Sequence, residues 1–164
     1  MSKGRLFVIS GASGVGKSTV LAKVMGARPD LRFSVSATTR APRPGEQEAV
    51  SYYFVSKEAF RKMIDQGEFV EYDAHMNNFY GTPEAQLNEK LETGSVILDI
   101  EPNGAFMVRN RRPDATLIFI APPSLEELER RSLHGMQQNR EVLAAHEELR
   151  LFFEGLGLPV PLKM

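Results

Sequence analysis

Apolar residues along this chain fall into short runs that alternate with segments of helical periodicity. The runs at residues 5–10, 95–100 and 115–120 are bounded by turn residues, which is typical of strands buried inside a sheet. The segment 17–27 carries apolar residues on one face and is followed by residues that end helices. The segment 83–92 has proline at its start and glycine past its end, which is also typical of a helix. Strands that alternate with helices predict an α/β fold, in which a parallel sheet lies between two layers of helices.

The middle of the chain is richer in strands and loops. Strands are predicted there from β-branched and aromatic residues, at 33–38, 51–55 and 69–72. Residues 77–81 are expected to form a turn, and a helix is predicted over 57–66 after the N-cap Ser56. We therefore expect residues 34–82 to be a strand-rich insertion on the α/β core.

Further helices are predicted in the remainder of the chain. They span residues 103–112, a segment from Ser124 to Arg131, and residues 141–153. The tail that follows contains Pro159 and Pro161, which remove backbone donors and disfavour a central strand.

Composition and charge exclude several classes of protein. The chain has 164 residues, of which 42% are hydrophobic and 25% charged, as in an ordinary globular domain. The net charge of -1 gives no general attraction for nucleic acid or an anionic membrane, so any anion site is expected to be local. Cysteine is absent, and the histidines lack metal-ligand spacing. The apolar run within residues 1–10 is too short for a signal peptide or a membrane span, so we expect a cytoplasmic location.

A glycine-rich segment follows the first predicted strand. Residues 11–18, GASGVGKS, match the pattern G-x-x-x-x-G-K-[ST] between a strand and a helix, where backbone N–H groups can surround phosphate oxygens. Lys17 would reach the β- and γ-phosphates of ATP, and the Ser18 hydroxyl would bind Mg²⁺. The alternative is a glycine-rich turn with a chance lysine. The predicted ATP-binding residues are Gly11, Ala12, Ser13, Gly14, Val15, Gly16, Lys17, Ser18 and Thr19.

Two further places carry candidate chemistry. Asp99 ends an apolar strand, as an acid that holds the magnesium shell does, although a strand-end aspartate can also cap a turn. Arg40 and Arg43 lie on a proline-stiffened loop and can converge on one phosphate, to which Tyr52 and Tyr80 could donate hydrogen bonds. The alternative is a pair of solvated surface arginines, which composition alone favours.

Several motifs in this order resemble those of guanylate kinases. They are FSVSATTRAPRPGE, YYFV, EFVE, FYGT, LDIEPNGA and IFIAPPSLEELERR, and the resemblance covers the chain from Gly4 to about Arg131. It implies transfer of the γ-phosphoryl group of ATP to GMP, with Mg²⁺ as cofactor. It also implies one domain over 1–164: a core of residues 1–33 and 83–131, a GMP-binding insertion at 34–82, and a lid with a C-terminal helix over 132–164.

The resemblance assigns roles to single residues. The GMP phosphate would be bound by Arg40, Arg43, Tyr52 and Tyr80. The guanine base would be recognised by Ser36, Glu71 and Thr82. The metal and the guanine side would both be served by Asp99. The catalytic residues, which neutralise the transferring phosphoryl group, would be Lys17, Arg40, Arg43 and Arg131.

The chemistry of guanine agrees with the role of Glu71. Guanine presents two donors, N1–H and N2–H₂, and an ionised carboxylate is a pair of acceptors. Adenine places an acceptor at N1, so a buried carboxylate would reject it. Hydroxyls of Ser36 and Thr82 can donate to guanine O6. The alternative for Glu71 is a solvated strand residue.

The chain departs from the family pattern after Arg131. Met136 and His146 fall near the places of two lid arginines, and the tail does not continue into a last core strand. We therefore expect GMP binding to persist better than turnover, because losing such an arginine slows phosphoryl transfer by about a thousand-fold or more. An uncovered sheet edge could pair with another chain, so both a monomer and a homodimer stay open.

Two other functions compete with this interpretation. One is a non-catalytic module of the same fold that binds a nucleotide or a phosphopeptide, which the intact Lys17 and Ser18 disfavour. The other is a kinase for a different small phosphorylated acceptor, which Glu71 and Ser36 disfavour because both suit guanine.

Overall fold

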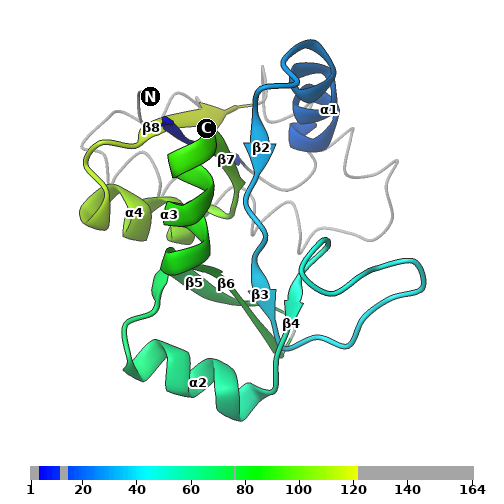
Figure 1. Ribbon diagram of the computed structural model, residues 1–164, viewed down its shortest axis with the longest axis vertical. Coiled ribbons are helices and arrows are strands. Elements are labelled where there is room, and N and C mark those ends of the chain that lie inside the picture. Colours follow the sequence, from blue (N-terminus) through cyan, green and yellow to red (C-terminus); the bar gives the residue numbers. More distant parts are fainter. Residues whose placement is uncertain (1–3, 12–14, 76, 122–164) are drawn as a thin grey trace, which may run out of the picture.

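The first of two sheets carries the glycine-rich segment at its edge. In the computed structural model, which describes residues 4–11, 15–75 and 77–121, this core sheet is entirely parallel, with strand order β2-β7-β1-β8 (Figure 1). Its strands are β1 (Leu6–Gly11), β2 (Arg32–Phe33), β7 (Val96–Asp99) and β8 (Thr116–Ile120). Because β1 and β7 are parallel neighbours with Ile9 opposite Asp99, their carboxyl ends meet at one edge of the sheet.

Helices cover both faces of the core sheet. They are α1 (Lys17–Ala27), α3 (Glu84–Thr93) and α4 (Pro102–Arg111). Leu21 of α1 packs with Ile9 and Ile97 on one face, and Leu87 of α3 and Val108 of α4 belong to the cluster on the other. Alternate residues of β1 and β7 point into these two clusters, as the period of a strand requires. The predicted α/β fold with helices on both faces is confirmed.

The second sheet lies below the core in Figure 1 and has the order β4-β3-β6-β5. Its elements are β3 (Ala37–Thr38), β4 (Tyr53–Phe54), β5 (Phe69–His75), β6 (Asn78–Pro83) and the covering helix α2 (Lys57–Asp65). Phe60 of α2 is fully buried and stacks on Phe69 and Phe79, with ring centroids 4.4 and 5.5 Å away. This aromatic stack is the small core of the second sheet.

The prediction of one strand over 33–38 is wrong, because this segment is divided between the two sheets. The backbone N–H of Ser34 donates to the Ile97 carbonyl in the core sheet at 3.0 Å. The Ser36 carbonyl accepts from the Tyr53 N–H in the second sheet at 2.9 Å. The chain therefore changes partner within three residues and passes from one sheet to the other, as the ribbon between β2 and β3 shows (Figure 1).

The predicted turn at 77–81 is also wrong, because β6 begins at Asn78 and pairs antiparallel with β5. The connection between these strands includes Asn77 at φ 62°, a left-handed conformation that asparagine tolerates better than most residues. The pairing sets Glu71 opposite Thr82. The hairpin thereby brings together two residues that are eleven positions apart in the sequence.

Helix α4 joins the two sheets. Arg111 donates a hydrogen bond to the Phe69 carbonyl, and Val70 of β5 is buried in the core cluster with Ala105 and Val108. β5 is therefore fixed against the core, next to the carboxyl end of β7. In the part of the chain that the structure describes, no helix is long and apolar enough to cross a bilayer. The helices predicted beyond residue 121 lie outside the described residues.

Candidate active site

Two positions of the glycine-rich segment, Gly11 and Gly16, require glycine. A Cβ on Gly11 would lie 2.4 Å from the Ile120 carbonyl oxygen, and Gly16 precedes α1 with φ 99° in the left-handed region. Val15, which lies between these glycines in the sequence, is buried. Ser18 and Thr19 are exposed in the first turn of α1. The predicted ATP-binding residues Ala12, Ser13 and Gly14 lie outside the described residues.

Lys17 faces two acids at the carboxyl end of β7. Its Nζ lies 3.7 Å from Asp99 Oδ1 and 3.5 Å from Glu101 Oε1, and it donates to the Gly11 carbonyl at 3.2 Å. Burial raises the pKa of Asp99, and the nearby Lys17 opposes that shift. The ammonium group is thus held at the start of α1. Sequence reasoning did not single out Glu101, although an acid two residues after Asp99 was a signal for it.

A cavity of about 470 Å³ opens between the core sheet and the second sheet. Five of the predicted GMP-binding residues line it: Ser36, Tyr52, Glu71, Tyr80 and Asp99. The remaining lining comes mainly from β5 and from the start of α4, and it includes the carboxylates of Asp73 and Glu101. Sequence-distant residues from both sheets therefore meet around one space.

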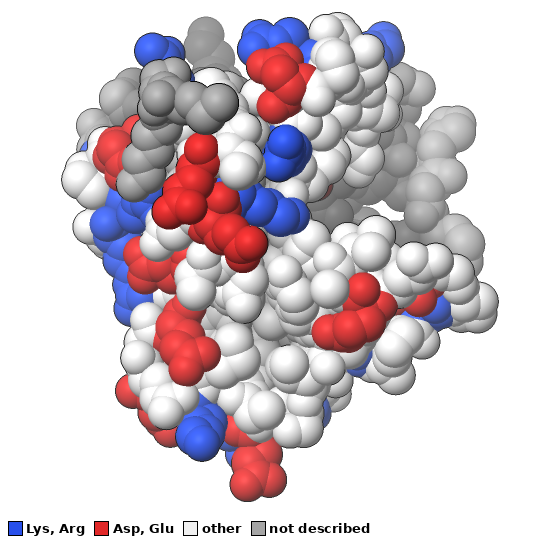
Figure 2. Space-filling model, in the orientation of Figure 1, with Lys and Arg blue, Asp and Glu red and all other residues white. Residues whose placement is uncertain are grey.

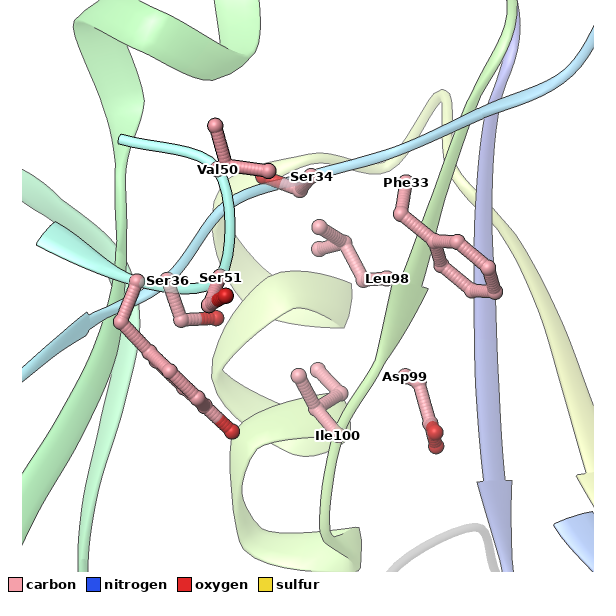
Figure 3. A pocket seen from close by; sticks show the side chains of 9 residues that line it. Phe33, Ser34, Ser36, Val50, Ser51, Leu98, Asp99 and Ile100 are labelled. Carbon is pink, nitrogen blue, oxygen red and sulfur yellow. The ribbon is translucent and has the colours of Figure 1, made fainter. Parts of the chain in front are cut away.

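A smaller cavity of about 260 Å³ adjoins the first and shares with it Ser36, Tyr52, Asp99 and Ile100. Figure 3 shows Ser36 and Ser51 on one side of this smaller cavity and Asp99 on the other. The hydroxyls belong to the second sheet and its loop, whereas Asp99 ends a core strand. The two cavities thus lie at the junction of the sheets.

Glu71 is a carboxylate almost removed from water. Only 4% of the residue is exposed, and its Oε1 accepts a hydrogen bond from the fully buried Thr82 hydroxyl at 2.5 Å. Burial, with a smaller contribution from the charge of Asp73, raises the pKa of Glu71 to about 7, and the Thr82 hydrogen bond opposes this shift. A Cβ on Gly104 would come within 2.6 Å of Glu71 Oε2, so the carboxyl group lies directly against the backbone of α4. The Thr82 hydroxyl and the α4 backbone at Gly104 therefore fix the position of the Glu71 carboxyl group.

Arg40 belongs to an aromatic and charged cluster beside the cavity. Its guanidinium carbon lies 5.3 Å from the centre of the Tyr52 ring, which in turn meets the Tyr80 ring edge-on at 6.1 Å. Arg40 also forms a two-point ion pair with Glu46, through N–O distances of 2.9 and 2.8 Å. The Arg43 side chain is exposed, and its backbone N–H donates to Glu46 at 2.7 Å.

The predicted site residues are thus brought together to different degrees. Arg40, Tyr52 and Tyr80 form one cluster, and Glu71 with Thr82 forms another, deeper one. Arg131 lies outside the described residues.

Across residues 4–11, 15–75 and 77–121 no group of three or more acids and histidines could hold a metal unaided. On the face seen in Figure 2, acidic and basic side chains are interspersed, so the local clusters rather than a general field define the site.

The fold and the site define the chain as an α/β nucleotide-binding kinase. The family model described as guanylate kinase matches residues 3–153. A guanylate kinase of Rubrobacter xylanophilus is 53% identical over 132 residues, which are 80% of this chain and 69% of the relative. One from Synechococcus is 52% identical, with 79% and 60% covered, and one from Clostridioides difficile is 44% identical, with 92% and 77% covered. The chain belongs to the guanylate kinase family.

A solved structure supports the same assignment. The crystal structure of guanylate kinase from Anaplasma phagocytophilum matches with a TM-score of 0.67 and 34% sequence identity. The match covers 92% of this chain and 72% of that one. The curated relatives named above are longer, since the chain spans between 60% and 77% of their length.

Proposed function

We propose that the chain binds GMP in the cavity between its two sheets and transfers to it the γ-phosphoryl group of ATP. The observation that carries this proposal is the buried Glu71–Thr82 pair at the wall of a 470 Å³ cavity whose lining also includes Tyr52 and Tyr80. The part of the cavity at Glu71 offers a carboxylate to a purine that carries two donors. The cluster of Arg40, Tyr52 and Tyr80 offers a cation and hydroxyl groups to a phosphate.

Base selection would depend on the charge state of Glu71. An ionised carboxylate accepts from guanine N1–H and N2–H₂, whereas adenine would leave a buried acceptor facing an acceptor. Because the pKa of Glu71 is about 7, the carboxyl group can lose its proton near neutral pH to meet these donors. The half-buried Ser36 and the acids Asp73 and Glu101 line the same cavity and complete its polar wall.

Phosphoryl transfer needs positioning and charge neutralisation more than it needs a general base. An oxygen of the GMP phosphate is already ionised at neutral pH and can attack the γ-phosphorus directly. Lys17, Arg40 and Arg43 would share the neutralisation of the developing charge, and Arg131 is predicted to add to it. Lys17 is held beside Asp99 at the start of α1, close to where the γ-phosphate is expected.

The residues at this edge of the core sheet also suit a magnesium ion. Mg²⁺ is usually bound through one or two carboxylates and the substrate phosphates, with water completing its shell. Asp99 and the exposed Ser18 hydroxyl are the groups that would hold it here. When bound, it would neutralise charge on the β- and γ-phosphates. The reduced turnover predicted from Met136 and His146 concerns residues outside the described part and stays a prediction.

Calorimetric titration with GMP and with AMP tests the proposal. We expect the wild-type chain to bind GMP and to reject AMP by at least about a thousand-fold, because a mismatched base leaves buried groups unpaired. Glu71→Gln, which replaces an acceptor by a donor, should lose most GMP affinity, whereas the exposed Glu92→Gln should bind like wild type. A folded protein that binds neither nucleotide, or both equally, would contradict the proposed function.

A further inference from the structure

Three of the five N–H donors of Arg40 bond to Glu46 and Ala41. Nη1 donates to Glu46 Oε2 at 2.9 Å and to the Ala41 carbonyl at 2.8 Å, and Nη2 donates to Glu46 Oε1 at 2.8 Å. These bonds use both Nη1 hydrogens and one on Nη2. An arginine side chain has five donors in a rigid planar fork, so Glu46 and Ala41 leave Nε–H and the second Nη2–H for other partners. One such partner is Tyr80, whose side chain hydrogen-bonds Arg40.

The two remaining donors lie side by side on one edge of the guanidinium plane. A parallel pair of this kind matches two oxygens of one phosphate. The guanidinium carbon of Arg40 lies over the Tyr52 ring, and the hydrogen bonds of Arg40 with Glu46 and, to a smaller degree, with Tyr80 raise its pKa. Both tyrosines line the large cavity, so Arg40 is packed against its wall.

We infer that Glu46 is a positioning residue that orients Arg40 so that its Nε–Nη2 edge, together with Tyr80, meets the acceptor phosphate. The inference rests on the proposed function, because it concerns how the GMP phosphate is held. Glu46 also accepts the Arg43 N–H at 2.7 Å, so one carboxylate sets the place of both arginine-bearing segments. Its role is to orient Arg40 before the substrate arrives, which reduces the ordering that binding requires.

The charge of Glu46 is maintained at any ordinary pH. Arg40 and the Arg43 N–H lower the pKa of Glu46 to about 2, so the carboxyl group stays ionised. A carboxylate next to an anion site would normally repel the ligand. Here it lies on the Nη1–Nη2 end of Arg40, and the phosphate would approach the other edge. Orientation is therefore expected to outweigh repulsion in its effect on GMP affinity.

Glu46→Gln tests this role selectively. The amide oxygen can keep the bonds from Nη1 and from the Arg43 N–H, but its NH₂ group must then face the Nη2 donor of Arg40. We expect the GMP dissociation constant to rise between about 10- and 100-fold, as for a lost charged hydrogen bond. Guanosine, which has no phosphate, should bind both proteins equally. Glu48→Gln is the matched control, because Glu48 lies in the same loop and bonds only the Phe54 N–H among the described contacts.

A second pair of proteins separates positioning from simple support of the loop. Arg40→Lys removes the planar fork, so adding Glu46→Gln to it should weaken GMP binding further by less than about threefold. Three results would overturn the inference: unchanged GMP affinity in Glu46→Gln, an equal loss in both backgrounds, or an equal loss for guanosine. Failure of the proposed function itself would appear as absent GMP binding in wild type. If Glu46→Gln melts early, Glu46→Asp replaces it in the same titrations.

Discussion

Glu71 combines two demands that oppose each other at the scale of a single residue. Recognition of guanine requires an ionised carboxylate, whereas burial favours the protonated form and raises the pKa to about 7. Thr82 offsets part of this cost through its 2.5 Å hydrogen bond. The residue therefore remains responsive to pH in the range in which the protein would work.

The affinity for GMP should depend on pH through Glu71. GMP requires the ionised form of Glu71, so affinity should increase as pH rises to about 7 and level off above it. Below that pKa, the dissociation constant should increase by up to about tenfold per pH unit. Guanosine provides the control, because it lacks the second phosphate ionisation near pH 6. A flat profile for guanosine in wild type would show that Glu71 does not need to lose a proton.

The free energy of unfolding should also depend on pH through Glu71. The pKa of Glu71 is raised in the folded protein from 4.5 to about 7, so the folded state holds the extra proton between these values. Stability should therefore fall as pH rises from 4.5 to 7, by on the order of 3 kcal/mol for this group alone. Urea unfolding of wild type and Glu71→Gln over this range measures the difference. An identical pH dependence in both proteins would contradict the assignment.

Helix α4 determines the shape of the site at the scale of elements. It packs on the core sheet through Val108 and on β5 through Arg111, so its first turn lies against the Glu71 carboxyl group. Gly104 is the point of contact, since any side chain there would meet Glu71 Oε2. The position of α4 thus fixes how the carboxylate faces the cavity.

Gly104→Ala should displace the Glu71 carboxylate, because the new Cβ would lie 2.6 Å from its Oε2. A buried side chain has little room to move, so we expect GMP affinity to fall by about tenfold or more while the fold persists. Gly26→Ala is the control, because a Cβ at that helical position meets nothing within 4 Å. Equal GMP affinity in Gly104→Ala and wild type would show that this contact does not orient Glu71.

Elements with a local sequence signal were predicted well. The apolar runs of β1, β7 and β8 and the periodicity of α1 depend on neighbouring residues, and these elements form where they were expected. The division of residues 33–38 between two sheets depends on distant partners at Ile97 and Tyr53, which no local pattern reveals. β6 was predicted as a turn for the same reason, since its partner β5 provides its hydrogen bonds.

The site residues that could be predicted were also those with a local sequence pattern. Lys17 and Arg40 were found because they belong to recognisable motifs. Glu46, Glu101 and Gly104 were not singled out, because an acid on a polar loop or a glycine in a helix looks ordinary until its neighbours in space are known. The contributions of residues beyond 121 stay predictions.

Across the whole molecule, the two sheets meet around two adjoining cavities, and each sheet provides part of the chemistry. The core provides Lys17, at the start of α1, for ATP, and Asp99, at the end of β7, for the metal and the guanine side in the proposed reaction. The second sheet holds Glu71 and the Arg40 cluster, which face GMP. In the described residues the two sheets are linked by the segment around Ser36, by α4, and by α3, which follows β6 directly and packs on the core through Leu87. Transfer would require both halves to act on their nucleotides together.

The rate of ADP formation from ATP by the full chain, with GMP or AMP as the acceptor, tests the proposed phosphoryl transfer most directly. We expect ADP formation to require GMP, to be at least about a thousand-fold slower with AMP, and to be lost in Lys17→Met. ADP formation that is independent of GMP, equal with AMP, or unchanged in Lys17→Met would contradict the proposed transfer.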